Sequence, residues 1–310
     1  MKRFKNILFI ADRDEDVEAG LERAISVAQT NGARLTVMDV TPDTGLADYF
    51  RQRYDIDLNA QLRENRLQSL DALVRAHADS GHAIYTKVVT GTPFIETILA
   101  VQRNRHDLVM KVAQHGAGLA QTIFGSTDMH LLRKCPCPVW IDRPTETGSY
   151  RRILAAVDPF DDESGNLQRL ILDLATSLAE REQARVEVVH AWQLPGESML
   201  RNGRGRIPPS ELELLLQEKE KRHRQALDAL LSHYGLDSGS ENVHLTKGKP
   251  AQVVSQCASD REIDLIVMGT VGRAGIPGLI IGNTAENVLR ENRIAVLAVK
   301  PGGFVSPVGG

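Results

Sequence analysis

Short apolar runs alternate with amphipathic segments along the whole chain. The runs 7–10 and 265–268 have the length and the continuity of buried strands. Between such runs, apolar residues recur at the spacing of one helical face, first at Val17, Leu21, Ala24, Ile25 and Ala28. Gly32 lies just past this pattern, where a glycine commonly ends a helix. This alternation predicts an α/β fold, with parallel sheets whose two faces are both covered by helices.

The pattern is regular enough to place most elements. In the first half we expect strands near 6–12, 34–40, 83–89, 107–112 and 137–141, and helices near 15–30, 54–79, 93–104 and 127–134. In the second half strands fit near 151–158, 185–192, 243–247, 264–269 and 294–299. Ser210 and Glu213 have the spacing of a capping box, which predicts the start of a helix.

Two long segments, 42–58 and 193–209, follow the second strand of each half and have no clear period. They contain apolar residues, which either roof a cavity at the edge of the sheet or pack as small satellite clusters beneath the loop. The sequence leaves both alternatives open.

The same order of elements occurs twice. The segment 6–12, which ends in Asp12, recurs as 152–158, which ends in Asp158. A constant offset then matches Pro93 with Pro250 and Thr127 with Thr284. The chain is therefore a tandem duplication, divided at the polar run 144–150, and we expect domains over 1–145 and 150–303. Right-handed crossovers make each sheet doubly wound, with ligands bound at the carboxyl ends of the strands.

The segment 264–289 carries the clearest sign of chemistry. It reads as a buried strand, then a loop rich in glycine, then the first turns of a helix. Glycines let the backbone approach a ligand closely, and the unpaired N–H groups of a helix start attract an anion. This segment therefore predicts a phosphate-binding loop.

Composition narrows the class of protein. The chain has 310 residues, 42% of them hydrophobic and 25% charged, which is typical of a soluble globular protein with two domains. A net charge of −3 gives no sign of a nucleic-acid-binding surface, and no apolar run approaches the length of a membrane span. The three cysteines are too few for a disulfide framework. We expect a cytoplasmic protein with neither nucleic acid nor membrane as partner.

The glycine spacing, Gly269-x₂-Gly272-x₉-Gly282-x-Thr284, and the aspartate that ends the first strand resemble the universal stress protein family in its tandem form. The resemblance covers essentially the whole chain. It implies an adenine nucleotide alpha hydrolase-like fold with five parallel strands in the order 3-2-1-4-5 in each half. It also implies that the fifth strands pair across a pseudo-twofold axis, so that the halves form an intrachain pseudo-dimer. Many members bind ATP, and others act through protein contacts.

The resemblance also implies roles for particular residues of the second half. Asp158 would approach the ribose or the adenine edge, because a carboxylate there accepts hydrogen bonds from sugar hydroxyls. Val189, near the end of the next strand, would border the base. Gly269 and Gly272 would let the loop close over the phosphates. The helix start would bind the phosphates through Gly282, Asn283 and Thr284.

Some positions depart from the nucleotide-binding pattern. Members that bind nucleotides usually have Ser or Thr directly after the third glycine, where this chain has Asn283, whose amide can still donate. In the first half, Val112 and His115 stand where the second half has Gly269 and Gly272. A β-branched side chain excludes a close approach to phosphate, so we expect the first half not to hold a triphosphate.

Other residues leave alternatives open. Cys135 and Cys137 are either a corner of a metal site or small residues packed at the start of a strand. His190 either lines the pocket or is bonded to solvent or backbone. Asp161 and Asp162 either hold a magnesium ion or are the acidic residues of a helix start. We assign no residue a catalytic or metal-binding role.

The sequence thus favours a non-catalytic stress-response protein that binds ATP in its second half. The alternative is a nucleotide-independent interaction module or a sensor of a small amphipathic ligand. Association of two chains into a homodimer is a further expectation, because two-fold pairing is the commonest form of assembly.

Overall fold

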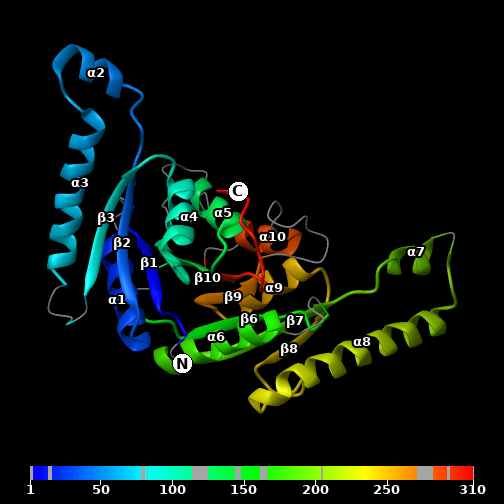
Figure 1. Cartoon of the computed structure of the whole chain (residues 1–310). Coiled ribbons are helices and arrows are strands. Elements are labelled where there is room, and N and C mark those ends of the chain that lie inside the picture. Colours follow the sequence, from blue (N-terminus) through cyan, green and yellow to red (C-terminus); the bar gives the residue numbers. More distant parts are fainter. Residues whose placement is uncertain are drawn as a thin grey trace.

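The fold is described from a computed structural model, which describes residues 3–12, 16–77, 81, 83–113, 125–143, 148–160, 166–203, 205–270, 282–291 and 294–309 (Figure 1). For Asn283 and Glu291 it describes the backbone alone. The predicted residues Gly272, His115, Asp161 and Asp162 therefore lie outside the described part of the chain.

The first half contains β1 (Asn6–Ile10), α1 (Val17–Asn31), β2 (Arg34–Thr41), α2 (Ala47–Tyr54), α3 (Leu58–Arg75), β3 (Ile84–Thr90), α4 (Pro93–Asn104), β4 (Leu108–Val112), α5 (Ser126–Lys134) and β5 (Val139–Asp142). The second half contains β6 (Arg152–Ala156), α6 (Asn166–Glu182), β7 (Arg185–Trp192), α7 (Glu197–Asn202), α8 (Pro209–Leu231), β8 (Val243–Lys247), α9 (Pro250–Asp260), β9 (Leu265–Gly269), α10 (Asn283–Glu291) and β10 (Ala295–Val299). A short 3-10 turn, Ser232–Tyr234, follows α8.

All the strands join one sheet of ten strands, in the order β3-β2-β1-β4-β5-β10-β9-β6-β7-β8. Within each half this is the predicted order 3-2-1-4-5, and all pairs there are parallel. The fifth strands pair antiparallel, with Leu297 opposite Trp140. The predicted fold class and the pairing of the halves as a pseudo-dimer are therefore confirmed.

Helices cover both faces of the sheet, as the continuous apolar strands predicted. Ile7 and Phe9 of β1 pack into the core beneath α1, α3, α6 and α8. Leu8 and Ile10 point to the opposite face and pack beneath α4, α5, α9 and α10. Each core continues from one half into the other, because β5 of the first half pairs with β10 of the second.

The ends of two helices test local sequence rules. Gly32 follows α1 in the left-handed conformation with φ 60°, as predicted. The predicted capping box of α8 is wrong, because the helix begins at Pro209 and Ser210 lies inside its first turn. A proline suits the first helical position, since its missing N–H has no partner there and its φ is already fixed.

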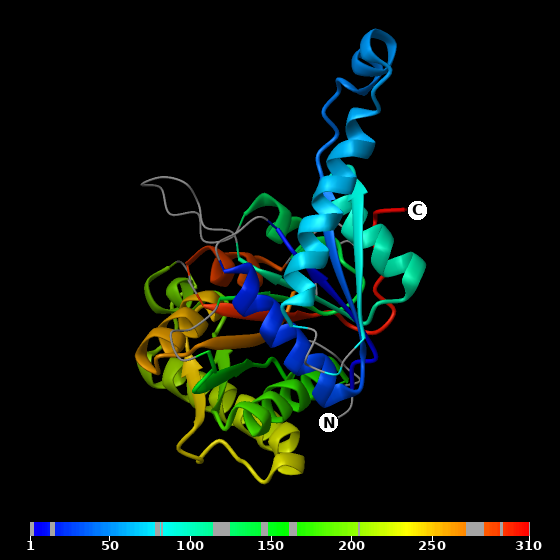
Figure 2. The same cartoon turned by 90° about the vertical axis from the view of Figure 1, so that its left-hand side faces the viewer.

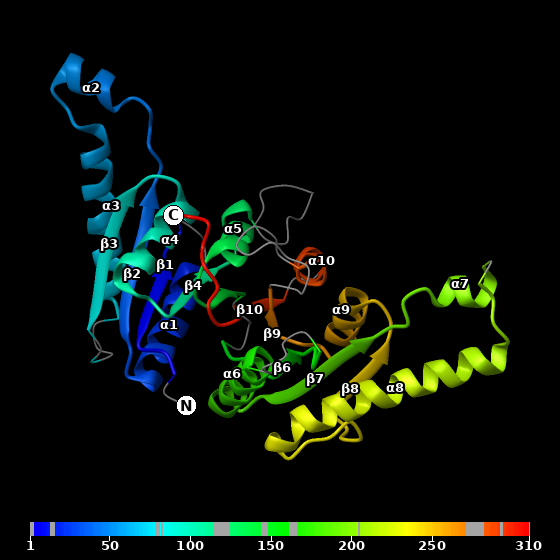
Figure 3. The ribbon, with the colours of Figure 1, turned by 45° about the vertical axis from the view of Figure 1, so that its right-hand side comes forward.

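The segments expected to be irregular each contain a short helix. In the first half, α2 sits at the end of an arm that α3 carries away from the sheet (Figure 2). In the second half, α7 lies at the outer end of α8 (Figure 3). Leu200 and Ile207 pack there against Trp192, Leu212 and Leu216, so they form a satellite cluster. This was one of the two alternatives for that segment.

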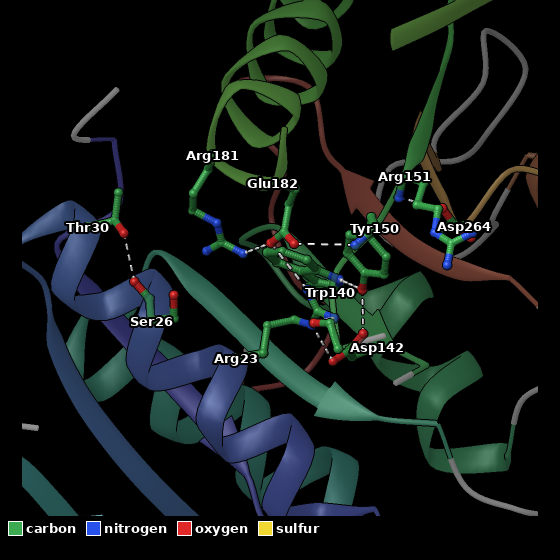
Figure 4. A network of polar contacts seen from close by, with 11 residues as sticks. Arg23, Ser26, Thr30, Trp140, Asp142, Tyr150, Arg151, Arg181, Glu182 and Asp264 are labelled. Atoms are coloured by element: carbon green, nitrogen blue, oxygen red, sulfur yellow. Dashed lines mark hydrogen bonds and ion pairs between the residues drawn. The ribbon is translucent and has the colours of Figure 1, made fainter. Parts of the chain in front are cut away.

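A buried polar network joins the halves (Figure 4). Arg23 of α1 donates from Nε to Oδ2 of Asp142 at 2.9 Å and from Nη1 to Oε1 of Glu182, in α6, at 3.2 Å. Its guanidinium lies 4.1 Å from the centre of the Tyr150 ring. The Tyr150 hydroxyl donates to Asp142 and accepts from Nε1 of Trp140 at 3.2 Å. Each charge has a partner from another element, which fixes α1 against α6.

Candidate functional site

The carboxyl ends of β6, β7 and β9 lie side by side, because β6 pairs with β7 and with β9. Asp158 follows β6 by two residues, beyond the pair that Ala156 forms with Met268. Its backbone N–H donates to Oε1 of Gln168 at 2.9 Å, and its Oδ1 accepts from the N–H of Phe160 at 3.1 Å. The turn therefore holds the carboxylate at the edge of the sheet where the sequence placed it.

Val189 lies on β7 beside β6. Its side chain is 1% exposed and packs in the core, while its carbonyl oxygen accepts from the N–H of Val157 at 3.0 Å. The side chain therefore faces the core, and only the backbone of Val189 can border a ligand.

Gly269 is the last residue of β9. A Cβ at this position would lie 3.2 Å from Cδ2 of Leu167 and 3.9 Å from Cδ1 of Ile171, both in α6. Close packing against α6 therefore favours a glycine here, in addition to any approach of a ligand.

Gly282 and Thr284 lie at the start of α10. Gly282 donates to the carbonyl oxygen of Thr270 at 2.8 Å and accepts from the N–H of Glu286 at 2.9 Å. Among the described side chains, none accepts from the N–H groups of this first turn. The carboxylate of Glu286 points instead to Arg133 and Arg290, at 2.9 and 2.7 Å. The positive end of α10 is thus not neutralised by the acidic residue of its own first turn.

The first half is built differently at the same place. Nζ of Lys111, in β4, lies 2.7 Å from Oδ2 of Asp12 and 3.0 Å from Oδ1 of Asp128, which is in the first turn of α5. It also donates to the carbonyl oxygen of Val112 at 2.8 Å. Lys111 and Asp128 are fully buried. Burial alone would lower the pKa of Lys111, but Asp128 and Asp12 outweigh it and raise that pKa.

Asp128 also closes the helix start. Its Oδ2 accepts from the N–H of Gly125 at 3.3 Å, so this carboxylate stands at the N-terminus of α5 where an anionic ligand would bind. The offset that relates the two halves matches Lys111 with Met268 and Asp128 with Ala285. The second half therefore has no counterpart of this triad.

Val112 has a packing role of its own. A Cβ on Gly20 of α1 would lie 2.2 Å from Cγ2 of Val112. The first half thus has a glycine on the helix and a large residue at the strand end, whereas Leu167 and Gly269 reverse this arrangement in the second half. In each half a glycine on one element faces a larger side chain on the other. This packing explains both glycines without reference to a ligand.

His223 is a residue near the site that the sequence gave no reason to select. Its Nδ1 lies 2.8 Å from Nε2 of His190, and Nδ1 of His190 lies 3.1 Å from the carbonyl oxygen of Val157. Because a carbonyl only accepts, His190 donates from Nδ1, and its Nε2 forms the hydrogen bond with Nδ1 of His223. Phe160 packs edge-on against His223, with the ring centres 4.7 Å apart.

Burial lowers the pKa of His223 to about 4, with a further lowering by His190. His223 is therefore neutral near pH 7. Of the two alternatives for His190, the structure supports bonding to the backbone.

Thr270 and Lys300 are a second pair that the sequence analysis missed. Thr270 follows Gly269 and is fully buried, and its hydroxyl accepts from Nζ of Lys300. Lys300 follows β10 and also donates to the carbonyl oxygens of Leu132 and, at 3.4 Å, Arg133. Burial lowers the pKa of Lys300 to about 8. A lysine is seldom buried to this extent, but its position in the sequence does not reveal the burial.

The described part of the chain shows neither a cluster of metal-ligating side chains nor a membrane-spanning helix. It contains no group of three or more His, Cys, Asp or Glu side chains placed to hold a metal ion. None of its helices is both long enough and apolar enough to cross a membrane.

Two regions of the chain, 3–143 and 149–300, match the model of the Universal stress protein family. The chain is 29% identical to Universal stress protein E of Escherichia coli (strain K12), covering 99% of this chain and 98% of that protein. It is 25% identical to the Universal stress protein E homolog of Haemophilus influenzae, with coverages of 96% and 98%.

Solved structures show the same fold. A functionally unknown protein from Pseudomonas aeruginosa PAO1 gives a TM-score of 0.74 at 23% identity, covering 97% of this chain and 94% of that one. A universal stress protein from Archaeoglobus fulgidus DSM 4304 gives 0.63 at 18% identity, with coverages of 95% and 98%. The resemblance drawn from the glycine spacing is confirmed: the chain belongs to the universal stress protein family, in its tandem form.

Proposed function

We propose that the chain is a non-catalytic stress-response protein that binds one adenine nucleotide, ATP, in its second half. The observation that carries the proposal is the contrast between the two helix starts. Asp128 and Lys111 fill the anion position at α5 with charges of the protein itself. At α10 the corresponding residues are Ala285 and Met268, and the carboxylate of Glu286 forms an ion pair with Arg133.

The described residues suit a nucleotide at this edge of the sheet. The α10 start supplies N–H groups for the phosphates at Gly282, Asn283 and Thr284, and Thr284 adds a hydroxyl. Asp158 would accept from the ribose hydroxyls. Gly269 and Gly272 would flank the loop over the phosphates. Any magnesium ion would arrive with the nucleotide and share Asp158.

Hydrolysis would require a positioned metal carboxylate and a group that orients water. Asp158 is the one carboxylate that we assign to the ligand, so the proposal is binding without turnover. We further propose that the domains span 1–145 and 150–303, that the protein is cytoplasmic, and that two chains form a homodimer.

A specific observation favours a second candidate, a nucleotide-independent interaction module. Tyr49, Phe50 and Tyr54 pack against one another on α2, with ring centres 5.6 to 6.3 Å apart. Tyr49 and Tyr54 are 57% and 55% exposed, and α2 stands clear of the sheet (Figure 2). Exposed aromatic clusters often mark contact sites for a partner or an amphipathic ligand.

Isothermal titration with ATP tests the first candidate. We expect wild type to bind and Gly282→Val to lose binding at least tenfold, because a branched side chain would block the approach of phosphate to the helix start. The matched control is Gly125→Val at the start of α5, which should bind as wild type does. Absence of heat at millimolar ATP would overturn the proposal. A non-nucleotide ligand that copurifies in native mass spectrometry would then favour the second candidate.

A further inference from the structure

Two cysteines meet where the halves join. Cys135 ends α5, and Cys137 lies two residues further on, just before β5, which pairs with β10 of the second half. Their sulfur atoms are 3.6 Å apart. Cys135 is fully buried and Cys137 is 8% exposed, so Cys137 is the more exposed of the two. A disulfide would require the sulfurs to approach by only about 1.5 Å.

A buried cation lies beside this pair. Lys300 donates to the carbonyl oxygens of Leu132 and Arg133, directly before the cysteines in the chain. Among the described residues, no carboxylate forms an ion pair with its ammonium. Burial raises the pKa of the Cys135 thiol, but the hydrogen bond with Cys137 and the charge of Lys300 outweigh it and lower that pKa. The same hydrogen bond, together with burial, raises the pKa of Cys137. The pair can therefore lose its first proton from Cys135, while the second remains between the sulfurs.

We propose that Cys135 and Cys137 are an oxidation site that closes to a disulfide on reaction with a small hydroperoxide. The proton that remains between the sulfurs moves to Cys135, the sulfur of Cys137 attacks the peroxide, the O–O bond breaks, and the alkoxide leaves with that proton. Cys135 then attacks the sulfenic sulfur of Cys137, and the leaving hydroxide is protonated to water. In total, two thiols and one hydroperoxide become a disulfide, an alcohol and one water.

Within the described residues, the third cysteine, Cys257, lacks the neighbours that Cys135 and Cys137 have. Cys257 lies in α9, and burial raises its pKa to about 11. The described part of the chain places no second thiol beside it. At the position of Cys137 the second half has Ile294. The dithiol therefore belongs to the first half alone, next to the β5–β10 contact that holds the halves together.

The test treats the reduced full-length protein with hydrogen peroxide and follows the intact mass. Because Lys134 precedes Cys135, trypsin releases both cysteines in one peptide and Cys257 in another. We expect that first peptide to lose two hydrogens and to regain them with dithiothreitol. Cys257→Ser, the matched control, should react as wild type does. Cys135→Ser should instead gain oxygen at Cys137, and Lys300→Met should slow the reaction about tenfold.

Three results would overturn the proposal. They are oxygen addition without a disulfide in wild type, a disulfide that includes Cys257, and no reaction of the folded protein at peroxide levels that oxidise the unfolded chain. Circular dichroism shows whether each variant is folded. If Cys135→Ser does not fold, Cys137→Ser is the second variant that cannot form the disulfide.

Discussion

In both halves the first strand, the fourth strand and the helix after it have the same arrangement. The side-chain contacts between these three elements differ. In the first half, Lys111 ties the end of β4 to Asp12 after β1 and to Asp128 at the start of α5. In the second half, Met268 and Ala285 occupy the matching positions, and the carboxylate in the first turn of α10, Glu286, pairs with Arg133. One copy of the fold thus neutralises its own anion position, while the other, as we propose, leaves it for a ligand.

Under the proposed function, a glycine-rich loop is not the only determinant of a phosphate site. Val112 in the first half is explained by Gly20 opposite it, just as Gly269 is explained by Leu167. The residues at these two strand ends, Val112 and Gly269, therefore follow the packing of each half. The charges at the helix start carry the stronger functional signal.

The largest expected effect comes from removing the buried cation. Lys111→Met leaves Asp128 buried without its partner, and we expect urea unfolding to show a loss of about 3–5 kcal/mol. Adding Asp128→Ala should recover most of this loss, because the uncompensated charge is then gone. The control, Met268→Leu in the second half, should change stability by less than about 1.5 kcal/mol. A Lys111→Met variant as stable as wild type would mean that the triad has no structural role.

The exchanged glycines should differ in their tolerance of a methyl group. A Cβ at Gly20 would lie 2.2 Å from Val112, whereas one at Gly269 would lie 3.2 Å from Leu167. We expect Gly20→Ala to destabilise the protein by about 1–3 kcal/mol and Gly269→Ala by less. Val112→Ala, added to Gly20→Ala, should relieve the contact. Thermal unfolding measures all of these variants, and the reverse order would refute the packing explanation.

A third expected effect is a pH dependence that belongs to the second half. The pKa of His223 is about 4 in the folded protein and 6.5 when unfolded, so the unfolded chain binds more protons between these values. Stability should therefore be full above pH 6.5 and fall as the pH drops toward 4. His223→Gln should flatten this slope, whereas His233→Gln, at an exposed histidine, should not. Equal slopes in the two variants would show that His223 does not cause the effect.

Much of the fold was predictable because it follows from periodicity. Buried parallel strands are continuously apolar, which marks the inner strands of the sheet. The strands in the described part of the chain all fall near the predicted positions, and their order within each half followed from the family resemblance. The helix α2 was missed because it packs on no core and therefore shows no apolar face. The start of α8 was misplaced because Ser210 imitates a cap, while the prolines before it set the actual start.

The candidate site was predictable only in part. Asp158 lies at the edge of the sheet as expected, because the end of a strand fixes its position. Val189 faces the core, which the alternation of side chains along β7 could have shown. Lys111, His223 and Lys300 were missed, since their roles depend on partners far away in the sequence. A single sequence does not reveal which buried charge meets which.

Native mass spectrometry of ATP binding, with stoichiometry per chain, tests the central contrast most directly. Wild type should bind one ATP, and Met268→Lys with Ala285→Asp, which imports the triad of the first half, should bind none while melting cooperatively. Lys111→Met with Asp128→Ala, altered in the first half alone, should keep the ATP of the second half. If the Met268→Lys, Ala285→Asp variant bound ATP as wild type does, the second-half helix start would not be the binding site.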